Sequence, residues 1–248
     1  MYVAHYISKN HDKIITFGNS FLSLWIPILG VLLLIFPSNF STAIILFSMV
    51  IMLLFLGGYP FKYLFLMCSS VLLVFILFVV SAKAFPDYIP NRVDTWANRI
   101  TNFSSSEKNA NYQIERSKIA IASGGLYGKG AGKSVMKNFL PQSSSDFIYA
   151  IIIEEYGLIG GLSILLAYTL FLLRIIIISN KSESIFGSLL VIGLGIPIVF
   201  QALINIGVSV ELFPVTGQPL PLISSGGTSI WMTCIAIGII QSVRNLRK

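Results

Sequence analysis

Long apolar runs, broken by polar turns, constrain the fold of this chain more than any other feature. Six of them approach or reach the roughly 20 residues that an α-helix needs to cross the hydrocarbon core of a bilayer. Hydrophobic residues make up 55% of the 248 residues and charged residues only 11%, which is not the balance of a soluble domain. The sequence therefore predicts an all-α, polytopic transmembrane protein with a single membrane domain over residues 1–248. The expected spans are about 17–36, 43–57, 63–82, 147–178, 186–210 and 222–242.

Two polar or irregular segments interrupt this pattern. Residues 83–145 contain nine Lys or Arg and four Asp or Glu, and nine minus four leaves +5. Attraction to anionic lipid headgroups and a pocket for an anionic, phosphorylated substrate both explain this charge. Residues 212–221 contain three prolines, which a regular helix excludes. We expect a long loop in the first segment and an irregular, re-entrant crossing in the second.

The charges of the short connections predict the orientation of the chain. The N-terminal segment, the turn with Lys62, the turn with Arg174 and Lys181, and the C-terminus are all basic. Short basic connections stay in the cytoplasm, whereas long loops escape this rule. We therefore expect both termini in the cytoplasm and residues 83–145 outside. The N-terminus shows no short apolar run with a cleavage site, so no removable signal peptide is expected.

The cysteines and the net charge limit the class of ligand. Cys68 and Cys234 both fall inside apolar runs, where they are expected to pack as small hydrophobic residues and not as a disulfide or metal pair. The net charge is +7, but nucleic acid is not an expected partner of so apolar a chain.

A glycine-rich stretch, residues 128–134, resembles a nucleotide-binding loop. That loop needs a glycine where this chain has Tyr127, and it follows a β-strand, which is not expected here. We therefore exclude a nucleotide site. The backbone N–H groups, flanked by Lys129 and Lys133, could still bind a phosphate, and the alternative is a flexible turn.

Three acidic residues lie in or beside the fourth predicted span. Asp146 stands at its mouth, where a carboxylate either caps a helix or takes part in chemistry, and the two roles are compatible. On a regular helix Glu154 would lie about 12 Å below Asp146 on nearly the same face, whereas Glu155 would point away. Glu154 is therefore a candidate for a site or proton relay, or for a paired residue that holds helices together.

Several motifs, taken in order, resemble the SEDS family, which includes FtsW and RodA. The resemblance lies in residues 112–130, 140–160, 200–208, 212–217 and 219–229. It implies a glycosyltransferase that polymerises lipid II into glycan strands outside the cytoplasmic membrane. It also implies a class B penicillin-binding transpeptidase and other division or elongation proteins as partners. The turn at residues 39–43 and the serine run before Asp146 favour the division-type FtsW branch.

The resemblance carries the family's essential acid onto Asp146, where it would act as a general base. Cations would stabilise the departing pyrophosphate. Lys118, Lys129 and Lys133 lie nearest the motifs, and Arg99 and Arg116 are weaker candidates. Gln113 would contact the substrate, and Gln201, Ser224 and Ser225 would line a cavity. No cofactor is expected to be obligatory. Mg²⁺ or Mn²⁺ could share the leaving-group charge, although the sequence contains no dedicated ligand cluster.

The chain departs from the family pattern in two ways. Gln142 and Ser144 stand where family members commonly have Glu and His, so roles of those groups do not carry over. The family has about ten spans and six are expected here, so the resemblance covers the C-terminal two-thirds. Two alternatives therefore stay open: a flippase for the same lipid-linked substrate, and an inactive scaffold for a division complex.

The predicted topology is tested by thiol labelling. A cysteine placed at Ser105, in a background without Cys68 and Cys234, should react with a membrane-impermeant reagent on intact cells. A cysteine at Lys181 should react only after permeabilisation. The reverse pattern would overturn the orientation derived from the short basic connections.

Overall fold

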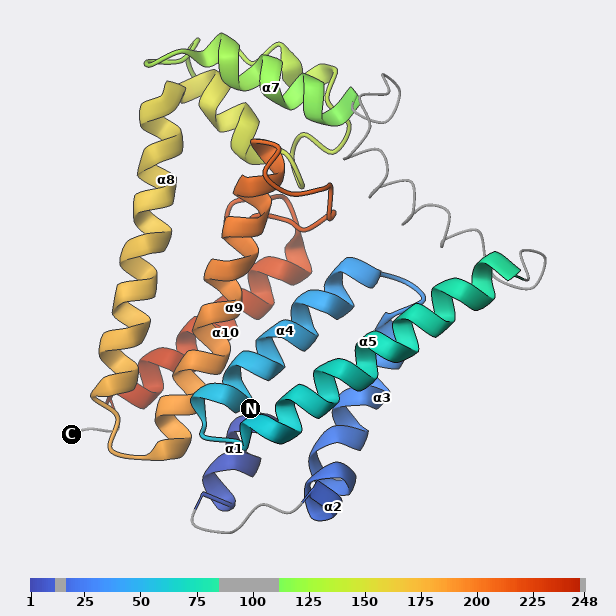
Figure 1. The fold of residues 1–248 in the computed structure, drawn as a ribbon. Coiled ribbons are helices and arrows are strands. Elements are labelled where there is room, and N and C mark those ends of the chain that lie inside the picture. Colours follow the sequence, from blue (N-terminus) through green and yellow to red (C-terminus); the bar gives the residue numbers. More distant parts are fainter. Residues whose placement is uncertain (12–16, 85–111, 246–248) are drawn as a thin grey trace.

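The computed structural model describes residues 1–11, 17–84 and 112–245. Every regular element in these ranges is a helix, which confirms the predicted all-α class (Figure 1). Arg99, Ser105 and the first part of the 83–145 loop lie outside the described residues. The helices are α1 (Tyr2–Lys9), α2 (Phe17–Ser20), the π-helix η1 (Phe21–Trp25), α3 (Ile26–Ile35), α4 (Phe40–Leu56), α5 (Phe61–Ala84), α7 (Tyr112–Gly124), the 3₁₀-helix η2 (Met136–Asn138), α8 (Ile148–Asn180), α9 (Ile185–Ser209) and α10 (Gly227–Asn245).

Four helical stretches are long and apolar enough to cross a membrane. They are Phe17–Ile35, which joins α2, η1 and α3, Phe61–Val80 of α5, and the whole of α8 and α9. Helix α4 is apolar but has 17 residues, and α10 carries polar residues along its length. Of the six expected spans, four therefore meet the criteria of length and hydropathy, and the other two are shorter or more polar helices.

The N-terminal half packs around a buried cluster that includes Ile7, Trp25 and Leu54. Tyr59, in the turn between α4 and α5, is the polar centre of this cluster. Trp25 Nε1 donates a hydrogen bond to its hydroxyl oxygen at 3.2 Å, and Ser20 also hydrogen-bonds to it. These bonds fix the turn against the first membrane stretch, because a buried tyrosine hydroxyl without a partner is costly.

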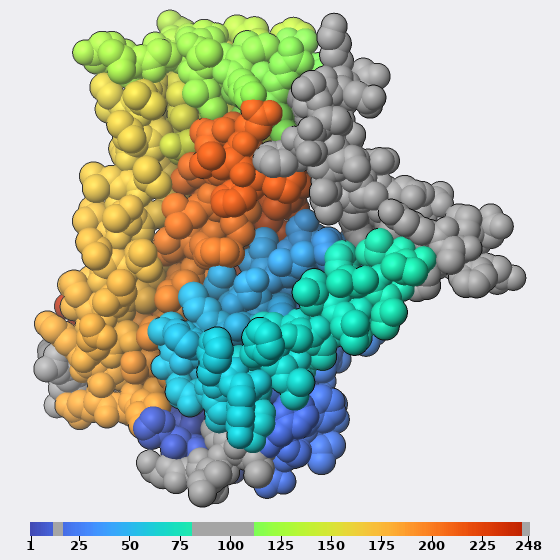
Figure 2. Space-filling model, viewed as in Figure 1, coloured from blue at the N-terminus to red at the C-terminus, as the bar shows by residue number. Residues whose placement is uncertain are grey.

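The C-terminal half is a bundle of α8, α9 and α10, across one end of which α7 and the residues after it form a cover (Figures 1 and 2). Small residues allow the helices to approach closely. At Gly195 of α9, an added Cβ would lie 2.5 Å from a carbon of Ile175 in α8. Ile175 belongs to a buried cluster that all three helices share.

Helix α8 is broken at Gly157, which has φ 72° and ψ −174°. Figure 1 shows its first turns directed sharply away from its long remainder. The break leaves backbone groups on both sides without their helical partners, and the loop after α7 supplies new ones. The four bonds run from Lys129 N to Glu154 O (2.9 Å), from Gly130 N to Glu155 O (2.9 Å), from Leu158 N to Gly125 O (2.9 Å) and from Ile159 N to Leu126 O (3.4 Å).

These four hydrogen bonds bring the two backbones so close that each needs a glycine at the contact. A Cβ at Gly157 would overlap the Leu126 carbonyl, and one at Gly128, which has φ 77°, would overlap the Glu155 carbonyl. As a straight helix the fourth apolar run, residues 147–178, would be roughly 48 Å long, which exceeds the ~30 Å hydrocarbon core. A run of this length must tilt, project or break, and this one breaks at Gly157.

The sixth predicted span begins later than its hydropathy suggests. The expected start was about residue 222, but α10 begins at Gly227. Leu222 has φ 67°. Ser224 Oγ accepts a hydrogen bond from Leu220 N in the crossing and donates one to Ser145 O in the segment before α8. Residues 221–226 therefore belong to the irregular crossing and not to the helix.

Gly157→Ala should lower stability by at least about 3 kcal/mol, because it adds a Cβ both to a glycine-only backbone conformation and to a carbonyl contact. Gly238→Ala is the matched control, since Gly238 lies in α10 with nothing within 4 Å of an added Cβ. Thermal unfolding in detergent should show a large drop for the first variant. The control should show no drop, because alanine favours a helix. Equal unfolding temperatures for the two variants would contradict the role of Gly157 in the backbone contact at the break.

Candidate functional site

Asp146 lies in a run of turns, residues 141–147, that leads into α8. The N-cap of α8 is Phe147, and its side chain makes no capping bond. Asp146 therefore stands one residue before the N-cap position of α8. The neighbours Phe147 and Leu140 are buried in one apolar cluster with Ile151 and Val208. They anchor the segment, while Asp146 itself is half-buried.

Three consecutive carbonyl groups before and at Asp146 are held by α9 and the irregular crossing. Ser225 donates to Ser144 O from its N–H at 2.9 Å and from its hydroxyl at 3.0 Å. Ser224 Oγ donates to Ser145 O at 2.5 Å, and Asn205 Nδ2 donates to Asp146 O at 2.7 Å. With these carbonyls fixed, the backbone that carries the Asp146 carboxylate has little freedom.

The crossing approaches the Asp146 carboxylate at Gly217. This glycine has φ 68°, and a Cβ added to it would lie 3.6 Å from Asp146 Oδ2. The preceding residues, Val215 and Thr216, line a groove of about 350 Å³ between the crossing, α4 and α9. Apart from Ser41, Ser48 and Thr216, the lining is apolar. The carboxylate therefore stands next to one end of a groove suited to a hydrocarbon chain.

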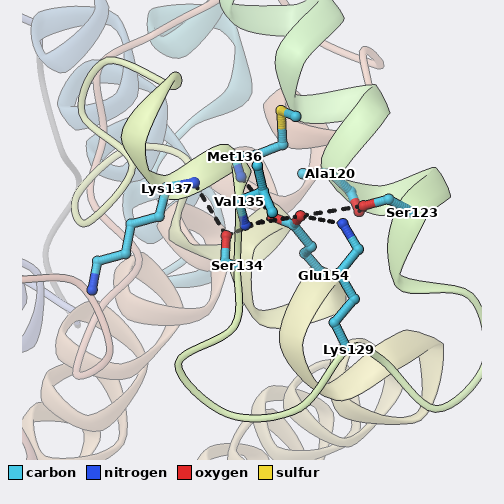
Figure 3. Close-up of polar contacts among 8 residues, drawn as sticks. All are labelled: Ala120, Ser123, Lys129, Ser134, Val135, Met136, Lys137 and Glu154. Carbon is cyan, nitrogen blue, oxygen red and sulfur yellow. Dashed lines mark hydrogen bonds and ion pairs between the residues drawn. The ribbon is translucent and has the colours of Figure 1, made fainter.

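Glu154 is the centre of a second polar cluster, at the end of the bundle that α7 covers (Figure 3). Its side chain is fully buried, and both carboxylate oxygens accept hydrogen bonds. The donors are Lys129 Nζ (2.6 Å), Ser134 Oγ (2.5 Å), Ser123 Oγ (3.3 Å), Val135 N (3.2 Å) and Met136 N (3.2 Å). A buried carboxylate with five donors, one of them the ammonium group of Lys129, holds the loop after α7 against α8.

A comparison with known families decides the relationship of this chain. A family model for the cell cycle proteins FtsW, RodA and SpoVE matches residues 1–248. The chain belongs to this family. Since its helices are also long and apolar, it is a multi-pass membrane protein.

Individual members of the FtsW/RodA/SpoVE family match the chain over nearly all of its length. It is 32% identical over 250 residues to the probable peptidoglycan glycosyltransferase FtsW of Nitrosococcus halophilus, covering 98% of this chain and 62% of the relative. It is 34% identical over 253 residues to that of Coxiella burnetii, covering 98% and 64%. The stage V sporulation protein E of Bacillus subtilis is 31% identical over 248 residues, covering 98% and 64%. The chain thus spans less than two thirds of the length of these relatives.

Solved structures of the family share the fold. RodA of Thermus thermophilus aligns with a TM-score of 0.61 at 21% identity, covering 98% of this chain and 61% of that one. A chain from a peptidoglycan synthase complex that coordinates polymerization and crosslinking aligns with a TM-score of 0.69 at 20% identity, covering 98% and 67%. At this identity the likeness supports the architecture.

The two acids at the start of the fourth span lie in different local structures. Asp146 lies in the turns before α8, whereas Glu154 lies inside α8 and bonds to the loop after α7. The break at Gly157 turns the Glu154 end of α8 toward that loop. Of its two predicted roles, the contacts favour the paired residue. Glu155 is half-buried, and its backbone carbonyl accepts the bond from Gly130.

Some of the cations predicted to bind substrate interact instead with other side chains of the protein. Lys129 pairs with Glu154, and Lys118 forms an ion pair with Glu211 at the end of α9. Arg116 stacks on the ring of Tyr112, with Cζ 5.0 Å from the ring centroid. Lys133 is exposed beside Gly130, and Gln113 is half-buried in α7.

Residues of the predicted cavity act mainly by holding the crossing. Gln201 Nε2 donates to Pro219 O at 3.1 Å, and Ser224 and Ser225 hold the segment before Asp146. Within the described ranges, no three His, Cys, Asp or Glu side chains gather as a metal site.

Sequence reasoning missed Asn205 and Gln218 as individual residues. Asn205 is buried and donates to Gln218 O as well as to Asp146 O, both at 2.7 Å, which links the crossing to the acid. The Gln218 side chain donates to Thr42 Oγ1 at 2.8 Å, which links the crossing to the start of α4. A polar residue inside an apolar run indicates a functional role, and Asn205 is such a residue in α9.

Glu154→Gln should destabilise the protein by about 2–4 kcal/mol, because the amide cannot accept from all five donors and leaves Lys129 unpaired. Glu155→Gln is the matched control and should stay within about 0.5 kcal/mol. Unfolding temperature and protease cleavage between residues 124 and 138 measure the effect. Similar values for both variants would show that the cluster does not fasten the loop.

Proposed function

We propose that this chain forms part of a peptidoglycan glycosyltransferase that polymerises lipid II at the outer face of the cytoplasmic membrane, in cell division. The observation that carries this proposal is the half-buried Asp146 carboxylate beside an apolar groove. Lipid II combines a sugar head with a long isoprenoid tail, so it needs a polar reacting group next to a hydrocarbon site. The names of the matched FtsW relatives support the same reaction.

The reaction assigns Asp146 the role of general base. Its carboxylate takes the proton of the acceptor sugar hydroxyl while that oxygen forms a bond to the donor's anomeric carbon. The bond from this carbon to the pyrophosphate oxygen breaks, and the lipid pyrophosphate leaves. The carbonyl bonds from Asn205, Ser224 and Ser225 keep the base in place, since orientation is a large part of such catalysis.

Exposed cations of the outer loop are proposed to stabilise the departing pyrophosphate. Lys133 and Lys137 are the candidates within the described residues, since Lys129 and Lys118 pair with acids. Arg99 remains a candidate from the sequence. Mg²⁺ or Mn²⁺ is proposed as an optional additional charge, and parallel assays with and without each ion decide whether it contributes.

The orientation and the partner follow from the same proposal. Both termini are placed in the cytoplasm by the short basic connections, so that α7 and Asp146 face outward. A class B penicillin-binding transpeptidase is the proposed partner. The likeness to a chain of a complex that coordinates polymerization and crosslinking supports it, because crosslinking is a transpeptidase reaction.

The distribution of acids favours a transferase over a flippase. A transporter needs polar sites through the bilayer. Among the described residues, the carboxylates are Glu115, Asp146, Glu154, Glu155, Glu183 and Glu211. Glu183 lies in the α8–α9 turn, whereas the others lie in α7, around the start of α8 or at the α9 end that pairs with α7.

Asp146→Asn tests the catalytic role. The asparagine keeps the size of the side chain but cannot take the proton, so polymerisation of lipid II should fall about 10²–10⁴-fold. The assay uses the chain with the additional N-terminal spans of its relatives joined to it, together with the transpeptidase. Membrane insertion and binding of the transpeptidase should persist.

Glu115→Gln serves as the control, because Glu115 is an exposed carboxylate of α7. Its rate should match the parent at equal protein level. A rate for Asp146→Asn within a few-fold of the parent would rule out the base. Transport of lipid II without polymerisation would favour the flippase, and the absence of both activities in the parent would favour the scaffold.

A further inference from the structure

A second cavity lies at the end of the bundle opposite α7, and we propose that it binds the headgroup of an anionic phospholipid. It has a volume of about 730 Å³ and is lined by the end of α8, the turn into α9 and the last turns of α10. Figure 1 shows that these segments lie at the end of the bundle away from α7. The proposal goes beyond the glycosyltransferase reaction and does not depend on it.

Three cations from separate parts of the chain line this cavity: Arg174 of α8, Lys181 of the turn and Arg244 of α10. Glu183 is the one carboxylate in the lining, so three minus one leaves +2. The ion pairs found among the described residues, Lys118–Glu211 and Lys129–Glu154, both involve the α7 end. The cations of this cavity are therefore available to an anion from outside the chain.

Part of the cavity lining is apolar. Ile178, Leu190 and Ile239 come from α8, α9 and α10, and Phe186 adds an aromatic ring. A soluble phosphate gains nothing from these apolar side chains, whereas a phospholipid presents a phosphate and the start of its acyl chains together. Basic pockets between membrane helices on the cytoplasmic side bind anionic headgroups in this way.

The walls of the cavity are fixed by packing and hydrogen bonds. Ser179 and Ser188 share a hydrogen bond at 2.7 Å between α8 and α9. Ser184 Oγ accepts from Gly187 N at 3.0 Å and caps α9. At Gly187 an added Cβ would lie 2.5 Å from Ser182 Oγ and 3.2 Å from a Val243 methyl carbon, so this glycine allows α10 to close the site.

The position of the cavity agrees with its charge. It stands at the bundle end away from Asp146, and the proposed orientation puts that end at the cytoplasmic leaflet, where anionic lipids attract Lys and Arg. Three of the cations that predict the orientation from the sequence, Arg174, Lys181 and Arg244, thus line one cavity in the fold.

Native mass spectrometry of the purified protein in detergent tests the proposal. Phosphatidylglycerol should bind more tightly than phosphatidylcholine with the same chains. Arg174→Gln with Arg244→Gln should weaken phosphatidylglycerol binding roughly 10- to 30-fold, since each cation contributes about fivefold. Lys9→Gln with Lys62→Gln removes the same charge outside the cavity and should change binding less than about twofold. Arg174→Lys with Arg244→Lys should retain most of the binding.

Equal losses in the two Gln pairs, or equal binding of the two lipids, would overturn the proposal. Displacement of the lipid by inorganic phosphate at a similar concentration would assign the cavity to a free anion instead. If the variant with both arginines changed to glutamine fails to fold, a salt titration of the parent protein tests whether charge drives the lipid binding. Phosphatidylglycerol binding should then fall with ionic strength while phosphatidylcholine binding does not, and salt-insensitive binding would overturn the site.

Discussion

The need to pair every backbone polar group in apolar surroundings governs the irregular parts of this protein. Helix α8 is broken at Gly157, and the groups released there bond to residues 125–130. The carbonyls of residues 144–146 bond to Asn205, Ser224 and Ser225. Non-helical backbone at membrane depth is tolerated where protein buries it. The polar backbone groups of the irregular segments therefore form hydrogen bonds with one another or with α9. The candidate site depends on all of these segments being in place.

Two carboxylates close in sequence have different environments for this reason. Glu154 is sealed, with five donors on its two oxygens. A carboxylate so fully engaged is poorly placed to accept a substrate proton, and it holds the outer loop on α8. Asp146 has its backbone carbonyl fixed by Asn205, and its carboxylate lies beside the crossing and the apolar groove. The contacts give Glu154 a structural role, and the proposed chemical role falls to Asp146. Sequence position alone does not distinguish the two acids.

Hydropathy predicted the helical class and most of the helices, because burial in lipid depends on composition over about 20 residues. It missed the start of α10, since Leu222 and Ile223 are apolar although they belong to the crossing. The break at Gly157 was among the solutions that the long fourth run required. The partners of Glu154 were beyond reach, because Ser123, Lys129 and Ser134 lie 20–31 residues away and meet it only through the fold. Asn205 was visible as a polar residue in an apolar run, but its two acceptors follow from tertiary structure alone.

The charge of the loop of residues 83–145 shows why a sum over a segment is a weak guide to binding. Five of its cations lie in the described residues 112–145: Arg116, Lys118, Lys129, Lys133 and Lys137. Two of these pair with Glu211 and Glu154, and Arg116 stacks on Tyr112. Figure 3 shows the Lys137 side chain directed away from the Glu154 cluster. In the proposed reaction, a pyrophosphate beside Asp146 would therefore meet a smaller charge than the sequence suggests. Because that reaction needs positive charge at its leaving group, the exposed Lys133 and Lys137 are the residues of this segment proposed to supply it.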